Sequence, residues 1–327
     1  MPEQAKTPAP SRKRTPPDIY VISPAGAVLE PARLTAGLAA LDTLGFKAVA
    51  DRAALSRSTR FAGSDATRAG AFTRAARQRA PIVMISRGGY GMSRILHRLD
   101  FEALADAGKH WVGFSDFTAF SLAMLARAGA GTWAGPAVLE LGMLAAQVAA
   151  SDEPDLCDDT TAASFCEAMR GQTECVGFEF QGPKGVEEEG VLWGGNLALV
   201  TAMLGTPYFP QVDGGLLFLE DVNEHPYRVE RMLCQLLDSG VIDRQAAVLL
   251  GRFSDYRLGE LDGGFNIDAV VAFLRSRTRT PIITGLPFGH GHGEPRLTLP
   301  HGARLGLATD RDLAWLVYPH THGDHSH

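Results

Sequence analysis

Short apolar runs alternate with helix-period stretches along the first half of the chain, and this alternation constrains the fold more than any other feature of the sequence. The predicted strands lie within 18–26, 46–51, 81–91 and 110–117, and helical stretches at 29–45, about 65–79 and after 117 follow them. Short buried strands separated by helices are typical of a parallel sheet with helices on both faces. The first half is therefore predicted to be a parallel α/β domain.

The pattern changes after about residue 150. Residues 151–172 are acidic and lack strand-like runs, which indicates a connecting segment with one short helix. Further on, apolar runs at 215–221, 246–253 and 303–308 are mixed with a helix at 226–240, so we expect a second, smaller mixed α/β domain. The expected division is a disordered tail at 1–17, a first domain at 18–150, a linker at 151–182, a second domain at 183–318 and a histidine-rich tail at 319–327.

Charge and hydropathy narrow the classes of partner. The chain has 327 residues, enough for two domains, and a formal net charge of -6, which does not favour nucleic acid or an anionic membrane. No apolar run approaches the roughly 20 residues that a membrane-spanning helix needs. The basic, proline-rich N-terminus has no apolar segment behind it and does not read as a signal peptide. These features predict a cytoplasmic protein that acts on a small molecule or peptide.

The sequence gives no firm signal for a metal or a cofactor. Its four cysteines form no CxxC pair, and the glycine-rich segment at 86–91 matches neither a Walker loop nor GxGxxG. The C-terminal HTHGDHSH could bind a divalent metal, but a terminal tail is a poor place for a built site, so adventitious binding is the better interpretation. We therefore expect no cofactor.

Ser115 lies at a corner between a predicted strand and a predicted helix, in GFSDF at 113–117. Such a corner can expose a serine nucleophile close to the N–H groups of the helix end. Serine followed by aspartate is equally typical of an ordinary helix N-cap. From this stretch alone both interpretations stay open.

Three further segments at strand ends carry residues suited to catalysis. The SRGGYG turn at 86–91 can present backbone N–H groups, as an oxyanion hole needs. A carboxylate that orients a histidine could be Glu220, Asp221 or Glu224. His290 could be a general base, or with His292 and Glu294 a metal ligand. Serine, carboxylate, histidine and glycine N–H groups together are the set that nucleophilic acyl transfer requires.

Six segments, in this order, resemble the LD-carboxypeptidase family of serine peptidases: SRGGYGMSRIL, GFSDFTAF, WGGNLALVTAMLGTPYFP, LLFLEDVNEHPYRVERML, LLGRFSD and GLPFGHGHGEPRLTLPHGARLGL. The resemblance covers about residues 18–315. It implies an N-terminal flavodoxin- or Rossmann-like domain, a C-terminal domain with a β-rich core, an active site between them and a metal-free homodimer. GFSDF departs from G-x-S-x-G, so an α/β-hydrolase fold is not implied.

The resemblance also implies a role for each candidate residue. Ser115 would be the nucleophile, Glu220 the orienting carboxylate and His290 the base. The backbone N–H of Asp116, with that of Gly88 or Gly89, would form the oxyanion hole. The expected pocket walls are Tyr90 and the stretch around Asn196, and Arg87 and Arg228 are the candidate cations for the carboxylate of the substrate.

The expected reaction is removal of the terminal D-alanine from the murein tetrapeptide L-Ala-D-Glu-diaminopimelate-D-Ala during peptidoglycan recycling. The first alternative is a microcin-immunity-type peptidase that cleaves aminoacyl-adenylate analogues, for which Trp193 could provide an adenine platform. The second is a non-catalytic two-domain protein that binds a small ligand. A metal hydrolase using His290, His292 and Glu294 is a third.

Overall fold

A six-stranded sheet organises the first half of the chain in the computed structural model, which describes residues 18–151, 155–291 and 294–319. Its strands, in spatial order, are β11 (Leu299–His301), β5 (Thr132–Ala134), β4 (His110–Gly113), β3 (Ile82–Ile85), β1 (Ile19–Ile22) and β2 (Ala48–Ala50). The pairings among β1 to β5 are all parallel, and only β11 pairs antiparallel. Every residue of β1 and β3 is buried, as the apolar runs predict.

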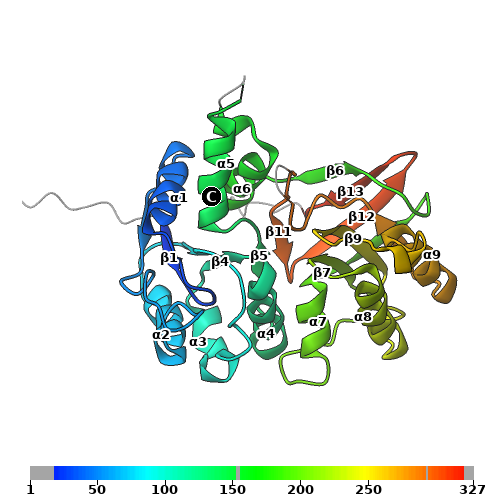
Figure 1. The fold of residues 1–327 in the computed structure, drawn as a ribbon, viewed down its shortest axis with the longest axis horizontal. Helices are drawn as coiled ribbons and strands as arrows, with labels where there is room; N and C mark the ends of the chain where they lie inside the picture. The colour runs from blue at the N-terminus through cyan, green and yellow to red at the C-terminus, as the bar shows by residue number, and fades with distance from the viewer. Residues whose placement is uncertain (1–17, 152–154, 292–293, 320–327) are drawn as a thin grey trace, which may run out of the picture.

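Helices cover both faces of this sheet (Figure 1). One face carries α1 (Pro31–Thr43), α5 (Val138–Val148) and α6 (Thr160–Arg170), and the other carries α2 (Asp65–Ala76), α3 (Phe101–Asp106) and α4 (Thr118–Ala128). A separate apolar cluster fills each side: Val21, Leu41 and Phe165 pack on the first, and Phe72 and Phe120 on the second. The short 3₁₀ segments nearby are η1 (Leu96–Arg98), η2 (Ser115–Phe117) and η3 (Leu156–Asp158).

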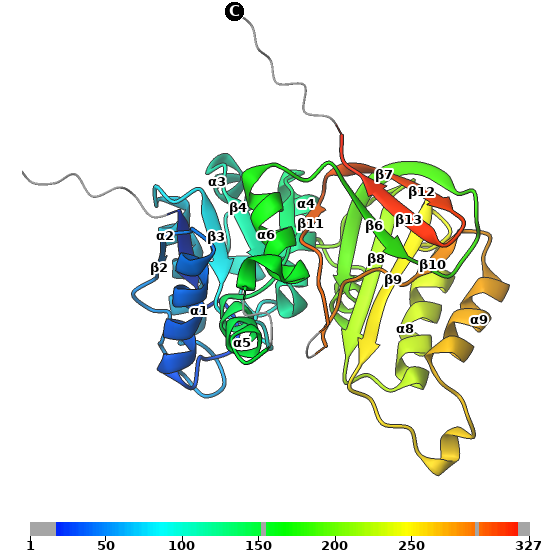
Figure 2. The same cartoon turned by 90° about the horizontal axis from the view of Figure 1, so that it is seen from above.

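The second half is built on a seven-stranded mixed sheet (Figure 2). Its strands, in spatial order, are β10 (Ile282–Thr284), β9 (Ala247–Ser254), β8 (Leu216–Val222), β7 (Glu187–Asn196), β12 (Arg304–Asp310), β13 (Leu313–Val317) and β6 (Cys175–Glu179). The pairings from β10 to β7 are parallel and those from β7 to β6 are antiparallel. The helical elements are α7 (Leu197–Met203), α8 (Pro226–Asp238), η4 (Glu260–Asp262) and α9 (Ile267–Arg277). The predicted fold class is confirmed.

Two strands depart from what the sequence indicates. The segment expected to be a linker contains α6, the single short helix predicted there, but also β6. Most residues of β6 are exposed or half-exposed because it lies at the sheet edge, so its apolar signal is weak. β11 comes from the second half of the chain yet completes the first sheet. Apolar periodicity does not reveal such an exchange.

The two halves meet along α4 and η2, which contact β7. The backbone N–H of Asn196, at the end of β7, donates to Thr118 Oγ1 at the start of α4 over 3.1 Å. Within the described part of the chain, no helix is long and apolar enough to cross a membrane. The predicted tails at 1–17 and 320–327 lie outside the described residues.

Candidate active site

Ser115 begins η2, immediately after β4 and before α4, as the sequence predicts. Its backbone φ is +63°, a left-handed conformation that costs a residue with a Cβ roughly 1–2 kcal/mol. The N-cap positions of η2 and α4 are Phe114 and Phe117, and neither helix has a side-chain cap. The N-cap interpretation of Ser115 is therefore wrong. Strain of this kind persists only where the surrounding structure fixes the residue, and it is frequent at active sites.

The turn at 86–91 lies directly against Ser115. A Cβ added to Gly88 would lie 3.0 Å from Ser115 Cβ and 3.1 Å from Ser115 Oγ, tighter than ordinary contact, so a larger residue would push against the serine. Gly89 has a φ of +109°, which also favours glycine. Among the described residues, neither Gly88 nor Gly89 donates its backbone N–H to an acceptor. These N–H groups are thus available beside the serine hydroxyl.

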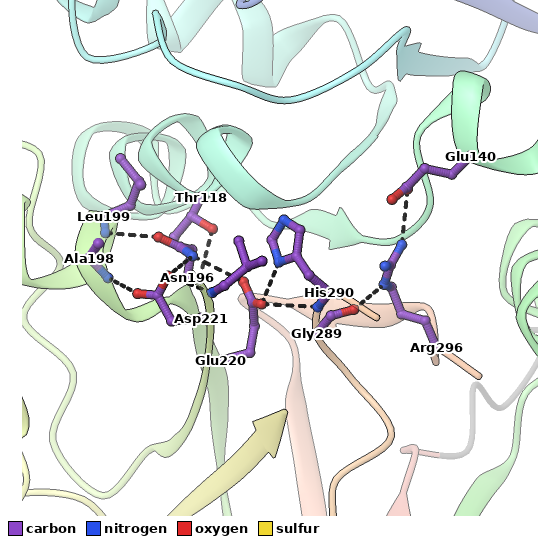
Figure 3. Close-up of polar contacts among 11 residues, drawn as sticks. Thr118, Glu140, Asn196, Ala198, Leu199, Glu220, Asp221, Gly289, His290 and Arg296 are labelled. Atoms are coloured by element: carbon purple, nitrogen blue, oxygen red, sulfur yellow. Dashed lines mark hydrogen bonds and ion pairs between the residues drawn. The ribbon is translucent and has the colours of Figure 1, made fainter. Parts of the chain in front are cut away.

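Glu220 and His290 form a close pair on the side of the second sheet (Figure 3). His290 Nδ1 lies 2.7 Å from Glu220 Oε2, and the backbone N–H of His290 donates to the same oxygen over 3.3 Å. The Glu220 side chain is fully buried near the end of β8, whereas that of His290 is 19% exposed. Because Glu220 binds Nδ1, Nε2 is the ring nitrogen left to exchange a proton with a ligand or a nucleophile.

Burial and the Glu220 carboxylate act in opposite directions on His290. Burial lowers the pKa of the imidazole, but the hydrogen bond and charge of Glu220 outweigh it, so the pKa of His290 is raised above its usual value. A base in this position holds its proton well once it has accepted one. That is the property a general base needs after it deprotonates a hydroxyl.

Asn196 forms hydrogen bonds to Glu220 and to the neighbouring Asp221 (Figure 3). Asn196 Nδ2 donates to Glu220 Oε1 over 3.3 Å and to Asp221 Oδ1 over 3.0 Å, while its Oδ1 caps α7 at Leu199. Burial, followed by the charge of Glu220, raises the pKa of Asp221 to about 6. Asn196 was expected in the pocket wall, but it is 5% exposed and acts as a buried partner of the two carboxylates.

Arg296 forms a second network around His290, which the sequence reasoning missed. Its Nε donates to the Gly289 carbonyl over 2.9 Å and its Nη1 to Glu140 Oε2 over 2.9 Å (Figure 3). Its guanidinium lies 3.8 Å from the centroid of the Phe114 ring, and that ring lies 4.8 Å from the imidazole of His290. An arginine in a loop carries no periodic signal, so only its place in the GLPFGHGHGEPR segment could have drawn attention to it.

Ser115, which follows the first sheet, and His290, beside the second sheet, line one cavity of about 210 Å³. Its lining includes Ser115, Gly88, Gly89, His290, Arg87 and Arg33. In the described part of the chain no hydrogen bond joins the Ser115 hydroxyl to His290, although both side chains line the same space. Catalytic hydrogen bonds are often loose without substrate, so this geometry is compatible with a nucleophile and its base. Arg33, on α1, is a second residue that the sequence reasoning missed.

Two of the predicted pocket residues, Tyr90 and Arg228, have surroundings that differ from the expectation. Tyr90 is 47% exposed, lies beside Phe61 and does not line this cavity. Arg228 pairs with Glu224 at 3.7 Å and does not line it either. The Asp116 side chain is buried, and its Oδ2 accepts the Met92 N–H over 2.8 Å. Burial raises the pKa of Asp116 to about 7.

The alternative chemistries find little support in the geometry. Among residues 18–151, 155–291 and 294–319, no group of three or more His, Cys, Asp or Glu side chains could hold a metal. His292 lies outside the described residues, and Glu294 pairs with Arg252 at 3.2 Å. Trp193 is 1% exposed and donates Nε1–H to Gln245 over 2.9 Å, so it belongs to the core and offers no platform for adenine.

Comparisons with known proteins agree with this arrangement of fold and site. Residues 19–135 match the LD-carboxypeptidase N-terminal domain and residues 189–307 the LD-carboxypeptidase C-terminal domain. The chain therefore belongs to the LD-carboxypeptidase family and is a peptidase of that family.

Individual relatives and a solved structure match most of the chain. A Streptomyces coelicolor protein is 36% identical over 92% of this chain and 93% of its own length. The murein tetrapeptide carboxypeptidase of Pseudomonas aeruginosa is 30% identical over 70% of this chain and 72% of its own. The crystal structure of muramoyltetrapeptide carboxypeptidase from Oxalobacter formigenes superposes with a TM-score of 0.78 at 38% identity, covering 92% of this chain and 99% of that one.

Proposed function

We propose that Ser115, His290 and Glu220 are the catalytic residues of a serine LD-carboxypeptidase. Ser115 Oγ attacks the carbonyl carbon of the scissile amide while His290 Nε2 takes the hydroxyl proton. His290 then protonates the leaving amine, and water hydrolyses the resulting ester. Glu220 keeps the second ring proton on Nδ1 and stabilises the imidazolium. The observation that carries this proposal is the 2.7 Å contact between a fully buried Glu220 and a His290 that shares a cavity with Ser115.

The oxyanion would be bound by backbone N–H groups on both sides of the serine. We assign one to Asp116 and the other to Gly88 or Gly89. The near contact between Gly88 and Ser115 supports this assignment, as does the lack of another acceptor for the two glycine N–H groups among the described residues. Such donors act mainly on the charge that develops in the transition state.

A carboxypeptidase also has to recognise the free carboxylate of the residue that it removes. Arg33 and Arg87 line the Ser115 cavity, and neither forms an ion pair in the described residues. Arg33 donates to Met143 Sδ and Arg87 to the Ala27 carbonyl over 3.3 Å, which are weak partners for a guanidinium. We assign the carboxylate to Arg87 and Arg33, with Arg33 in the place first expected for Arg228.

The substrate that best fits these features is a peptide ending in D-alanine. We propose the murein tetrapeptide L-Ala-D-Glu-diaminopimelate-D-Ala, cleaved in the cytoplasm during peptidoglycan recycling by a homodimeric enzyme. The names of the Pseudomonas and Oxalobacter relatives support this substrate. The burial of Trp193 argues against the adenylate alternative.

The test is to incubate the purified protein and its Ser115→Ala variant with the tetrapeptide and to follow free D-alanine by mass spectrometry. Release by the wild type alone is expected. Release by both would overturn the role of Ser115. If neither releases D-alanine, a parallel incubation with aspartyl sulfamoyl adenosine decides between the adenylate substrate and a non-catalytic binding role.

The carboxylate assignment has its own test. Replacing Arg33 and Arg87 together by Met should raise KM for the tetrapeptide, with a smaller effect on kcat, because their contacts with the carboxylate exist in both ground and transition states. Arg228→Met is the matched control and should leave KM unchanged. An unchanged KM in the double variant would refute the assignment.

A further inference from the structure

The segment from Arg87 to Met92, here called the glycine loop, is held against Ser115 by side chains that lie outside the cavity. Gly88 approaches Ser115 so closely that a Cβ there would contact the serine at 3.0 Å. Any movement of the loop would therefore change the distance between the glycine N–H groups and the carbon that Ser115 attacks. Two buried side chains, those of Asp116 and Arg68, form hydrogen bonds to the loop.

The first such group is the Asp116 carboxylate. Asp116 follows Ser115 directly, is 1% exposed and accepts the Met92 N–H at Oδ2 over 2.8 Å. The residue next to the proposed nucleophile thereby binds the far end of the glycine loop. The backbone N–H of Asp116 is assigned to the oxyanion, whereas its side chain bonds Met92.

The second group is Arg68 of α2, whose side chain is fully buried. Its Nη1 donates to the Gly91 carbonyl over 2.7 Å and to the Pro24 carbonyl over 2.8 Å. Gly91 has a φ of +152°, and a Cβ on it would lie 2.7 Å from Arg68 Nη1. Arg68 is itself held by Asp65 and by the Phe61 ring, whose centroid is 4.7 Å from its guanidinium.

Arg68 and Asp116 also interact through their charges beneath the loop. One side chain binds a carbonyl of the loop and the other binds the N–H of the next residue along the chain. A guanidinium and a carboxyl group with almost no exposure are costly to desolvate, and burial accordingly raises the pKa of Asp116 to about 7. This cost suggests a role in fixing the geometry of the loop.

We propose that the Asp116 side chain and Arg68 are positioning residues that hold the glycine loop where its N–H groups can bind the oxyanion. This inference rests on the proposed function, because it takes Ser115 as the nucleophile. Neither side chain lines the Ser115 cavity. Their effect passes through the backbone of Gly88 and Gly89, and so should fall on the transition state and not on substrate binding.

The first test compares two substitutions at Asp116. Asp116→Ala removes the acceptor for Met92 and should lower kcat for D-alanine release on the order of 10²-fold, the loss typical of one oxyanion donor, with KM within about threefold. Asp116→Asn keeps an oxygen that can accept the Met92 N–H and should retain kcat within about tenfold of the wild type. This rescue by the conservative variant separates positioning from a general loss of structure.

The second test alters the glycine loop at Gly91, where it contacts Arg68. Gly91→Ala introduces a Cβ against Arg68 and should lower kcat by at least about tenfold through the displaced loop. Gly108→Ala is the matched control, because Gly108 also has a positive φ of +59° but has no atom within 4 Å of the added Cβ. The control should lose some thermal stability and keep the wild-type kcat.

The rate at which a fluorophosphonate probe labels Ser115 provides a readout independent of the peptide. Labelling also builds negative charge on an oxygen beside the glycine loop, so it should slow in Asp116→Ala and Gly91→Ala in parallel with kcat. Equal labelling and equal kcat in Asp116→Ala and wild type would overturn the inference, as would an Asp116→Asn variant as impaired as Asp116→Ala. If the wild type is labelled but releases no D-alanine, the proposed substrate is wrong, and the labelling rates still decide the positioning role.

Discussion

The two sides of the candidate site are positioned by different physical means. On the Ser115 side the chain uses its backbone: a left-handed φ of +63° at the serine, and glycines where a Cβ would collide. On the His290 side it uses side chains, with Glu220, Asn196 and Arg296 joined by hydrogen bonds and charges in a largely buried setting. Ser115 itself should therefore respond to changes in backbone freedom, although its glycine loop is also bonded by the side chains of Arg68 and Asp116. The base side should respond to changes in charge and protonation.

The largest expected effect separates activity from stability at Ser115. Both Ser115→Ala and Ser115→Gly should lose kcat on the order of 10⁶-fold, because the nucleophile is gone. Ser115→Gly should nevertheless be more stable than Ser115→Ala by about 1–2 kcal/mol, because glycine adopts a positive φ without the Cβ clash. Chemical denaturation measures the difference, and equal stabilities would contradict the claim of backbone strain.

Glu220→Gln should reduce kcat on the order of 10³–10⁴-fold, because the amide no longer fixes the tautomer or stabilises the imidazolium. It should also move the acid limb of the kcat/KM profile to lower pH, since the glutamate charge raises the pKa of His290. Glu224→Gln, at a half-exposed carboxylate that pairs with Arg228, is the control and should leave the acid limb in place. An unshifted limb in Glu220→Gln would rule out Glu220 as the group that sets this pKa.

The Glu220–His290 pair makes the free energy of unfolding depend on pH. The pKa of His290 is raised in the folded state, so its interaction with Glu220 contributes fully below the unfolded value of about 6.5 and is lost as pH rises through the folded pKa. The free energy of unfolding of the wild type should therefore fall relative to that of Glu220→Gln across this range. Parallel pH curves for the two proteins would contradict the linkage.

Arg296→Met should destabilise the fold by about 2 kcal/mol, because it leaves the Gly289 carbonyl without its donor and breaks an ion pair whose arginine is buried and whose glutamate is partly exposed. kcat should fall by about tenfold because Gly289 precedes the base. Combining Arg296→Met with Glu140→Gln should cost less than the sum of the two single losses, since the residues form one pair. Strict additivity in a double-mutant cycle would show that the network does not act as a unit.

The smallest effect is expected at the contact between the two halves. Thr118→Val removes the acceptor for the Asn196 N–H and should cost about 1 kcal/mol of stability, with less than about a threefold change in kcat. Thr118→Ser keeps the hydroxyl and serves as the matched variant. Because valine keeps the methyl group and lacks only the hydroxyl, an unchanged stability in Thr118→Val would show that this hydrogen bond does not contribute.

The sequence predicted the Ser115 side of the site better than the His290 side. Ser115, Gly88 and Gly89 follow buried strands of one parallel sheet, so their arrival at one sheet edge follows from periodicity and parallel pairing. Glu220, on β8, and His290, in a loop, are 70 residues apart in the chain, and only the family resemblance singled out those two residues as a pair.

Some features carried no usable sequence signal at all. Arg33 lies on a helix far from the serine in the chain, and Arg296 lies in an irregular loop, so neither forms part of a periodic pattern. β11 pairs with a strand from the other half of the chain. Arg228 was expected to bind the carboxylate of the substrate, but on α8 it pairs with Glu224.

The most direct test of the account is whether the base from the second sheet activates the serine from the first. Wild-type protein, His290→Ala and Ser115→Ala would be treated with a fluorophosphonate probe, and the rate and position of the adduct measured by mass spectrometry. The account predicts a single adduct on Ser115 in the wild type, none in Ser115→Ala, and labelling slowed by orders of magnitude in His290→Ala. Labelling of Ser115 at the wild-type rate in His290→Ala would show that the two sides do not act as one catalytic site.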